Sequence, residues 1–274
     1  MILTQRAIDR HLGSFRAQEE TLYMWSGEVV GRLVPGFRNL AADLYWLRTV
    51  QYFGGERLFS QDKRFELLTP LVDITTTLDS RLEVAYRYGA IFLCEPRPMG
   101  GGRPQEGVAL LERGVLNLPH SWRLRQDLGF YTHLFLGDSR RAAEILLEAS
   151  ELPGAAYWLK TLAAEILAKG GDRASSRRMW QQMYDQADAE GGSIRANALE
   201  HLRILDALDQ ADRLTAAAFE FENRFGRAPR DLAEVAARGL APVPLYDHAG
   251  VPFDYDPTTG AVTVSRKSPL WRPR

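Results

Sequence analysis

One stretch of the sequence, residues 118–155, constrains the fold more than any other. It is bounded by Pro119 and Pro153, which lie 153 − 119 = 34 residues apart. Between the prolines, apolar residues recur with a helical period in two segments, 122–136 and 139–149. The stretch therefore predicts two helices joined by a tight turn, a unit of the size found in helical repeat proteins.

Residues that favour helix ends indicate where the helices of this unit, and of the rest of the chain, begin and end. Gly137 can end one helix in a left-handed conformation, and Asp138 can cap the next. Asn39 and Asp172 are expected to cap helices, and Pro104 suits a first helical turn. The predicted helices span residues 4–20, 40–53, 63–78, 82–95, 104–117, 122–136, 139–149, 155–168, 172–189 and 194–225.

Some positions interrupt the helical pattern. Gly54-Gly55 is expected to end the helix that begins at residue 40, and Pro70 implies a kink or a late start in the next one. Residues 21–36 predict an irregular segment or a short helix over the first pair, and 96–104 a loop longer than a tight turn.

The helices form successive pairs, at 40–78, 82–117, 121–150 and 155–189. Each pair has an apolar face that it cannot bury alone, so the pairs are expected to stack. Small residues stand where the helices of a pair should cross: Gly89, Gly129, Ala109, Ala142 and Ala143. With its 34-residue period, the region 40–190 resembles tetratricopeptide-repeat proteins. The resemblance implies an all-α solenoid of antiparallel helix pairs whose first helices line a concave, peptide-binding face.

The sequence after Gly226 has a different character. Residues 229–238 predict a short helix, and 251–255 and 261–265 predict two strands joined by a turn at 256–260. The order resembles the C-terminal half of type II secretion pseudopilins and related pilins, and the matching residues are Gly226, Pro229, Leu232, Pro244, Asp247, Gly250, Pro252, Phe253 and Tyr255. The chain lacks the pilin N-terminal membrane helix and has one extra residue between Pro244 and Asp247. We therefore expect a small cap of one helix and a β-hairpin.

Composition argues against several classes of function. A net charge of −1 and a pI of about 6.5 give no overall attraction to nucleic acid. No stretch reaches the roughly 20 apolar residues of a membrane span, and the start lacks the apolar core of a signal peptide. The single cysteine, Cys94, lies in an apolar run, and the five histidines form no metal-binding motif. We expect a non-enzymatic protein without a cofactor or metal.

Polar residues inside an apolar helix are the strongest candidates for a site. Asp43, Arg48 and Gln51 accompany Tyr45, Trp46 and Tyr52, and aromatic and arginine side chains are frequent anchors of binding surfaces. On later first helices, the groove would continue through Tyr86, Arg123, Asp127 and Tyr131. Two alternatives stay open here. The aromatic residues could be core, with Asp43 and Arg48 neutralising each other, or they could form a ligand pocket near Trp46 and Tyr52.

The run from Asp43 to Arg48, with Gln51-Tyr52, is also similar to bacterial envelope-associated repeat proteins. Together these features predict an N-terminal cap and lid over 1–39, helix pairs over 40–190, a long helix over 191–225 and the pilin-like tail over 226–274. The predicted function is a scaffold that binds a protein or peptide. The resemblances imply a pilus or secretion component as the partner, and the sequence assigns no compartment.

Overall fold

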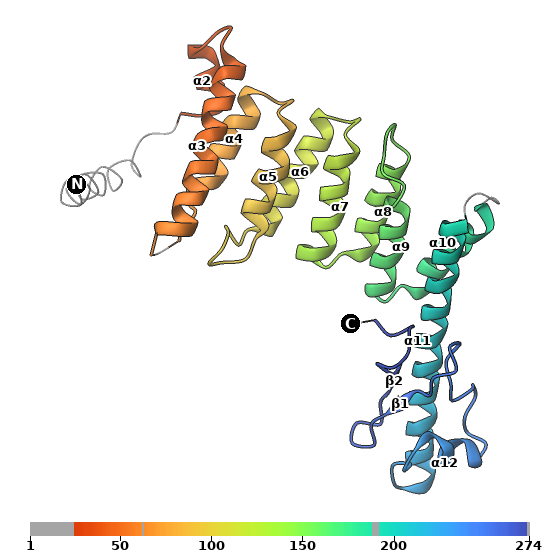
Figure 1. Ribbon diagram of the computed structural model, residues 1–274. Coiled ribbons are helices and arrows are strands. Elements are labelled where there is room, and N and C mark those ends of the chain that lie inside the picture. Colours follow the sequence, from red (N-terminus) through yellow and green to blue (C-terminus); the bar gives the residue numbers. More distant parts are fainter. Residues whose placement is uncertain (1–24, 62, 188–191, 273–274) are drawn as a thin grey trace, which may run out of the picture. The chain divides into compact units, whose positions relative to one another are not determined.

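The computed structural model describes residues 25–61, 63–187 and 192–272, which are mostly helical (Figure 1). The helix expected over residues 4–20 lies outside these ranges. The chain divides into two compact units between Leu159 and Lys160. We describe each unit by itself, because their relative placement is not determined.

The first unit consists of adjacent helices packed in pairs. A short helix, α2 (Gly27–Leu33), packs against α4. The pairs are α3 (Arg38–Phe59) with α4 (Leu68–Leu78), α5 (Glu83–Cys94) with α6 (Pro104–Asn117), and α7 (Trp122–Leu136) with α8 (Ser139–Ser150). The pairs follow one another in a row (Figure 1), an arrangement compatible with a helical repeat fold.

The unit predicted from residues 118–155 is the pair α7 and α8. The Ser121 side chain accepts a hydrogen bond from the Leu124 amide at the start of α7. Gly137 ends α7 with φ of 73°, and the Asp138 carboxylate accepts the Arg141 amide at the start of α8. These local signals set both ends of the turn, so the sequence prediction is confirmed here.

Other helix ends differ from the prediction. Helix α3 continues through Gly54-Gly55 to Phe59, although a glycine pair costs about 2 kcal/mol of helix propensity. Phe53 is buried just before the pair, and Arg57 after it reaches Glu95 at 2.9 Å, so contacts with neighbouring elements offset this cost. Pro70 lies in the first turn of α4, where no amide needs a helical partner, so the late start is correct. Helix α9 begins at Leu159 rather than Ala155.

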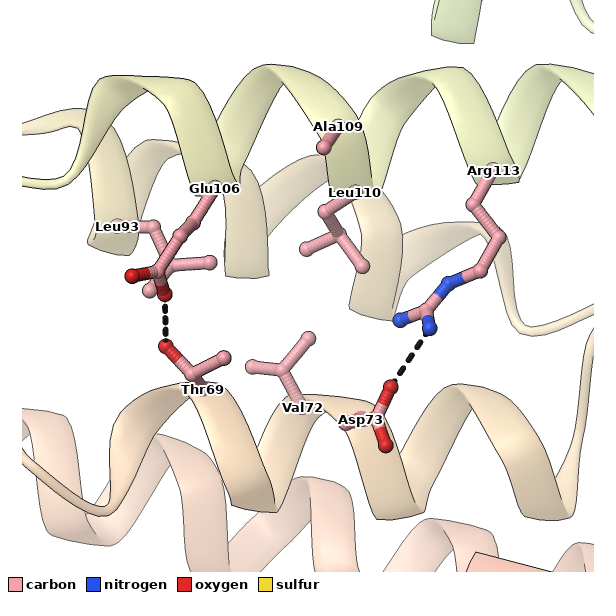
Figure 2. Close-up of a pocket in the computed structure, with 8 residues that line it drawn as sticks. All are labelled: Thr69, Val72, Asp73, Leu93, Glu106, Ala109, Leu110 and Arg113. Atoms are coloured by element: carbon pink, nitrogen blue, oxygen red, sulfur yellow. Dashed lines mark hydrogen bonds and ion pairs between the residues drawn. The ribbon is translucent and has the colours of Figure 1, made fainter.

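Polar contacts join the second helices of consecutive pairs (Figure 2). The Thr69 hydroxyl on α4 donates to the Glu106 carboxylate on α6 at 2.5 Å. One helical turn further along α4, Asp73 accepts from Arg113 at 2.6 Å. Asp73 and Arg113 are 40 residues apart. The spacing between neighbouring pairs here therefore exceeds the 34 residues of the starting pattern, because the loop before Pro104 adds length.

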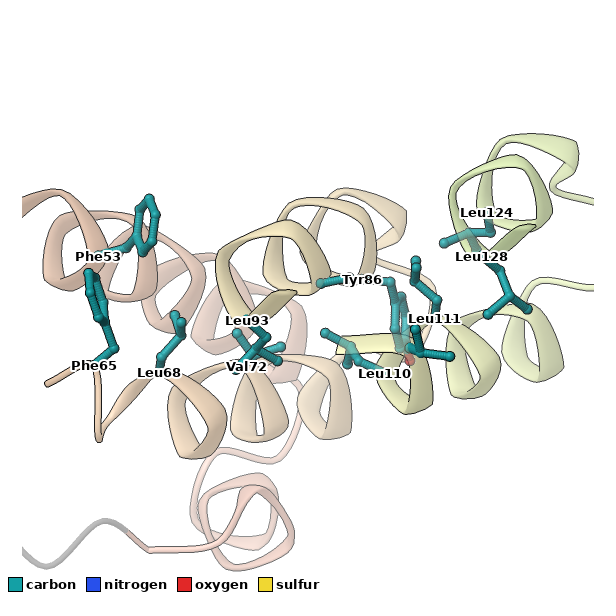
Figure 3. Close-up of a cluster of buried hydrophobic side chains, with 12 residues drawn as sticks. Phe53, Phe65, Leu68, Val72, Tyr86, Leu93, Leu110, Leu111, Leu124 and Leu128 are labelled. Atoms are coloured by element: carbon teal, nitrogen blue, oxygen red, sulfur yellow. The ribbon is translucent and has the colours of Figure 1, made fainter. Parts of the chain in front are cut away.

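The core of the first unit runs without a break from α3 to α7. Its buried side chains are Phe53, Phe65, Leu68, Val72, Tyr86, Ala90, Leu93, Val108, Leu110, Leu111, Leu124 and Leu128 (Figure 3). Members from different pairs contact one another, so each pair buries the apolar face of the next. This cluster therefore connects all three helix pairs of the first unit.

Glycines allow the helices to approach closely. A β-carbon on Gly107 would lie 2.3 Å from the Cys94 sulfur and 2.8 Å from the Ala90 carbonyl oxygen, both on α5. Gly129 has the same role between α7 and α8, as predicted, with Leu146 at 2.8 Å. Ala109 differs from the prediction, since its side chain is exposed. Gly107 and Gly114, which the sequence analysis did not single out, are the crossing residues of α6.

The second unit is organised around one long helix, α11 (Gly192–Phe225). Helices α9 (Leu159–Lys169) and α10 (Arg173–Gln186) share a buried cluster with its first half, in which the Trp180 and His201 rings stack at 3.9 Å. Arg173 and Arg177 on α10 pair with the aspartates of α11, namely Asp206, Asp209 and Asp212.

The C-terminal tail packs along α11 from Ile204 to Phe221. It comprises α12 (Leu232–Ala237) and two short antiparallel strands, β1 (Asp254–Tyr255) and β2 (Val262–Thr263). Phe253, Val262 and Leu270 share a buried cluster with α11, and the Val262 amide donates to the Thr215 hydroxyl at 2.9 Å. The predicted helix and hairpin are confirmed, and the tail is part of the second unit.

Within the ranges that the structure describes, we find no helix with the length and apolar character that crossing a bilayer requires.

The close crossing at Gly107 predicts opposite effects for two glycine-to-alanine changes. Gly107→Ala should lower the free energy of unfolding by at least about 1 kcal/mol, because a clash with backbone outweighs the gain in helix propensity. Gly55→Ala is the matched control: an added β-carbon there meets nothing within 4 Å, so the same change should stabilise by about 0.5–1 kcal/mol. Urea unfolding followed by circular dichroism measures both, and equal effects would contradict the packing argument.

Acid should weaken the tail through Glu234. Hydrogen bonds from the Arg227 guanidinium and the Arg230 amide lower the pKa of Glu234 to about 2. Since the folded-state pKa lies below the usual 4.5, the contribution to stability is complete above pH 4.5 and is lost as the pH falls towards 2. The difference in melting temperature between wild type and Glu234→Gln should shrink over this range. A difference that does not change with pH would contradict this assignment.

Candidate functional site

The first helices of the pairs, α3, α5 and α7, are joined by side-chain contacts. The Phe92 ring on α5 stacks on Phe53 of α3 with centroids 4.0 Å apart and planes 12° apart. Trp46 lies parallel to the same ring at 6.2 Å. These contacts fix α3 against α5, so they also fix the relative positions of the exposed side chains on the two helices.

An ion pair joins α5 to α7. The Arg87 Nε donates to Asp127 Oδ2 at 2.5 Å, and Nη2 lies 3.4 Å from Oδ1. Asp127 is buried, and this burial raises the pKa of its carboxyl, while the hydrogen bond from Arg87 offsets part of the rise. The fork geometry holds the two helices in one register.

Tyr131 lies one turn after Asp127, on the same side of α7. Burial raises the pKa of its hydroxyl, and the charge of Asp127 adds to the effect. Its ring contacts Phe135 edge-on at 5.5 Å. Asp127 and Tyr131 therefore lie next to each other on α7, and both belong to the α5–α7 junction.

The aromatic residues predicted on α3 mainly serve packing. Tyr45 packs in a cluster with Val30 and Ile74, and Trp46 stacks on Phe92. The Tyr52 hydroxyl accepts the Leu67 amide at 3.2 Å, at the start of α4. The side chains of Trp46 and Tyr52 are therefore engaged with neighbouring helices.

Tyr86 needs a correction, because its side chain is fully buried. It lies against Gly114, where the ring comes within 2.8 Å of the place that a β-carbon would occupy, and its hydroxyl accepts from Asn117 at 2.8 Å. It does not line an exposed groove. The apolar spacing of its helix was compatible with either place, and only the crossing with α6 decides it.

The charged candidates are exposed. Asp43, Arg48 and Gln51 lie on the outer side of α3, and the Arg123 guanidinium lies over its neighbour Trp122 at 4.5 Å. Asp43 and Arg48 do not pair with each other within the part of the chain that the structure describes. Five residues apart on a helix, they point to different flanks.

Exposed apolar residues on α5 and α7 were not among the predicted site residues. They are Val84 and Tyr88 on α5, and Phe130 and Leu134 on α7. Each pair is spaced by four residues, so its members lie on one face of their helix. Apolar pairs on the polar side of an amphipathic helix are the sequence signal that could have identified them.

A cavity of about 240 Å³ lies between α4 and α6 (Figure 2). Val72, Leu93 and Leu110 form its apolar lining, and the pairs Thr69–Glu106 and Asp73–Arg113 stand at its two ends. Since these polar groups already satisfy one another, the space suits a small apolar group better than a charged ligand.

The Cys94 thiol and the Asp256 carboxylate are both held in structural contacts. Burial raises the pKa of the Cys94 thiol to about 12, so it is protonated at neutral pH. The Asp256 carboxylate accepts hydrogen bonds from Thr258 and Thr259 in the hairpin turn. Among residues 25–61, 63–187 and 192–272, no three histidine, cysteine or acidic side chains are grouped to hold a metal ion.

Comparison of the chain with protein-family models, curated proteins and solved structures gives no significant match.

Because Asp127 is buried and Asp73 is exposed, removing the Asp127 carboxylate should lower the free energy of unfolding more than removing the Asp73 carboxylate. Asp127→Ala leaves Arg87 without its carboxylate at the α5–α7 junction and should cost about 1–3 kcal/mol of unfolding free energy. Asp73→Ala removes an equivalent partner from Arg113, but that pair is about half exposed and should cost less than about 1 kcal/mol. Urea unfolding compares the two variants. Equal losses would mean that Asp127 does not hold the junction.

Proposed function

We propose that the chain is a non-enzymatic interaction scaffold that binds a protein or peptide across its first helices. The observation that carries the proposal is the presence of exposed apolar side chains on both α5 and α7. Tyr88 is 54% exposed and Leu134 is 55% exposed, although both stand on well-packed helices. Exposed apolar side chains of this kind are typical of surfaces that bind other proteins.

The two helices that carry these residues are held together by an ion pair. The Arg87–Asp127 pair joins α5 to α7, and Arg87 directly precedes Tyr88. A binding residue held on a fixed helix loses little conformational freedom when a partner arrives. Arg123, one of the predicted residues, lies two helical turns before Phe130 and adds a charged group to the same face of α7.

The finer assignments rest on resemblance. The stacked helix pairs support membership of the tetratricopeptide-repeat class, in which first helices line a concave peptide-binding face. The helix and hairpin that follow α11 support the likeness to pseudopilin C-termini. On that basis we propose a pilus or secretion component of a bacterial envelope assembly as the partner.

The alternative, a sensor with an aromatic pocket, has less support. It requires Trp46 and Tyr52 to face a ligand, but Trp46 stacks on Phe92 and the Tyr52 hydroxyl is bonded to the Leu67 amide. Both side chains would have to leave their packing partners. The scaffold needs no such rearrangement.

A photo-crosslinking amino acid at Tyr88 tests the scaffold in cells of the native organism. It should give a discrete crosslinked band with a protein partner, and Tyr88→Ala with Phe130→Ala should reduce partner capture at least roughly tenfold, since two anchors near 1–2 kcal/mol each are lost. Tyr88 is 54% exposed and Phe130 is 39% exposed, so the double variant should stay folded with a modest fall in melting temperature.

The matched control carries the same crosslinker at Leu116, which is 80% exposed but lies on the second helix α6. No specific band is expected there. Bands of equal intensity from both positions, or none from Tyr88, would contradict binding across the first helices. Deleting the tail is a poorer test, because it would uncover the buried side chains of α11.

A further inference from the structure

The outer side of α3 carries an apolar stripe with alternating steps of three and four residues. The positions are Leu40, Leu44, Leu47, Gln51, Gly54 and Leu58, and Phe37 precedes them as the cap residue of the helix. The exposed fractions are 66% for Phe37, 56% for Leu40, 59% for Leu44, 56% for Leu47 and 72% for Leu58. A stripe with this spacing is the seam along which two helices form a coiled coil.

This stripe is separate from the surface that α3 buries inside the unit. Ala42, Thr49 and Phe53 face the core, so α3 is apolar on two opposite sides. It is also the first helix of the first pair, with no described pair before it (Figure 1). The terminal face of a stacked helical array is usually polar. An apolar one is suited to a partner.

Two charges flank the stripe. Asp43 precedes Leu44 on one side, and Arg48 follows Leu47 on the other. Both are exposed, and within the described ranges no hydrogen bond or ion pair reaches the side chain of either residue. With leucines at heptad positions d, a and d, Asp43 occupies position g and Arg48 position e. They are five residues apart, which is the separation of a g–e′ pair between two parallel helices.

We propose that α3 pairs with α3 of a second copy of this chain, in parallel and in register. The two-fold axis then runs along the seam and places Asp43 of each copy beside Arg48 of the other, which gives two equivalent ion pairs. The leucines at 40, 44 and 47 meet their own counterparts. Gln51 occupies an a position, where a polar residue fixes register at some cost in stability.

The charges favour this pairing over the alternatives. In an antiparallel pair, g positions face g′ and e positions face e′, so Asp43 would meet its own copy, Val50 or Arg57, depending on the register. Arg57 is the partner in the register that overlaps the whole helix, but it is already paired with Glu95 at 2.9 Å, and Arg48 would then face its own copy. The parallel arrangement leaves no like charges opposed. Space for close approach exists beyond Gln51, because β-carbons on Gly54 and Gly55 would meet nothing within 4 Å.

Sedimentation velocity of the full chain, from roughly 5 to 500 µM, is the first measurement, because weak homodimers dissociate in this range. We expect a monomer–dimer equilibrium. A chain that stays monomeric throughout would overturn the proposal.

Charge variants test the register. Asp43→Arg and Arg48→Asp should each weaken self-association roughly fivefold or more, because two attractive pairs become repulsive. An equimolar mixture of the two variants should restore the dimer. In the mixed dimer the introduced arginine at position 43 faces the introduced aspartate at position 48, and the native Arg48 of one chain faces the native Asp43 of the other. A mixture that associates no better than the separate variants would overturn the parallel arrangement.

The double variant Leu44→Glu with Leu47→Glu tests the seam itself. It should abolish the dimer while leaving the circular dichroism spectrum and the melting temperature of the dilute protein unchanged, because both side chains are exposed. Another occupant is residues 4–20 of the same chain. If the double variant lowers the melting temperature of a monomer and leaves its mass unchanged, that segment covers the stripe and the proposal fails.

Discussion

The close approach of α6 to α5 at Gly107 is the constraint on which the first unit depends. The α-carbon of Gly107 stands where any side chain would meet the Cys94 sulfur and the Ala90 carbonyl, and Gly114 has the same relation to the Tyr86 ring. Because both contacts involve the same helix pair, α5 and α6 can pack only in this orientation. The other pairs then add to this one, and their buried side chains form a single core from Phe53 to Leu128.

Ion pairs between helices give the stacking its register. Arg87 reaches Asp127 and Arg113 reaches Asp73, each across 40 residues of sequence, and Arg57 reaches Glu95 across 38. An exposed ion pair such as Arg113–Asp73 contributes little to stability. The directional bonds of these ion pairs nevertheless fix how one helix pair lies on the next. In the second unit, the two arginines of α10 do the same against the aspartates of α11.

The helix that carries most of the predicted site residues has two separate roles. Its aromatic side chains face inward, where Tyr45, Trp46 and Tyr52 hold α3 to its neighbours. Its charged side chains, Asp43 and Arg48, face outward beside an apolar stripe. One helix can therefore both close the core and present a surface. The residues that best support binding on the first helices lie further along, on α5 and α7.

The sequence by itself determined the local structure wherever a capping side chain, a turn glycine or a proline acts on nearby backbone. Ser121, Gly137, Asp138 and Pro104 act on backbone groups within a few residues, so helix ends near them were predictable. The hairpin after Phe253 was predictable for the same reason. Tertiary structure alone decided which side each helix buries. Tyr86 and Tyr88 stand two residues apart in one apolar helix, yet one is buried against Gly114 and the other is exposed. Spacing along a helix identifies its faces, but the neighbour that packs on each face is set by contacts far apart in the sequence.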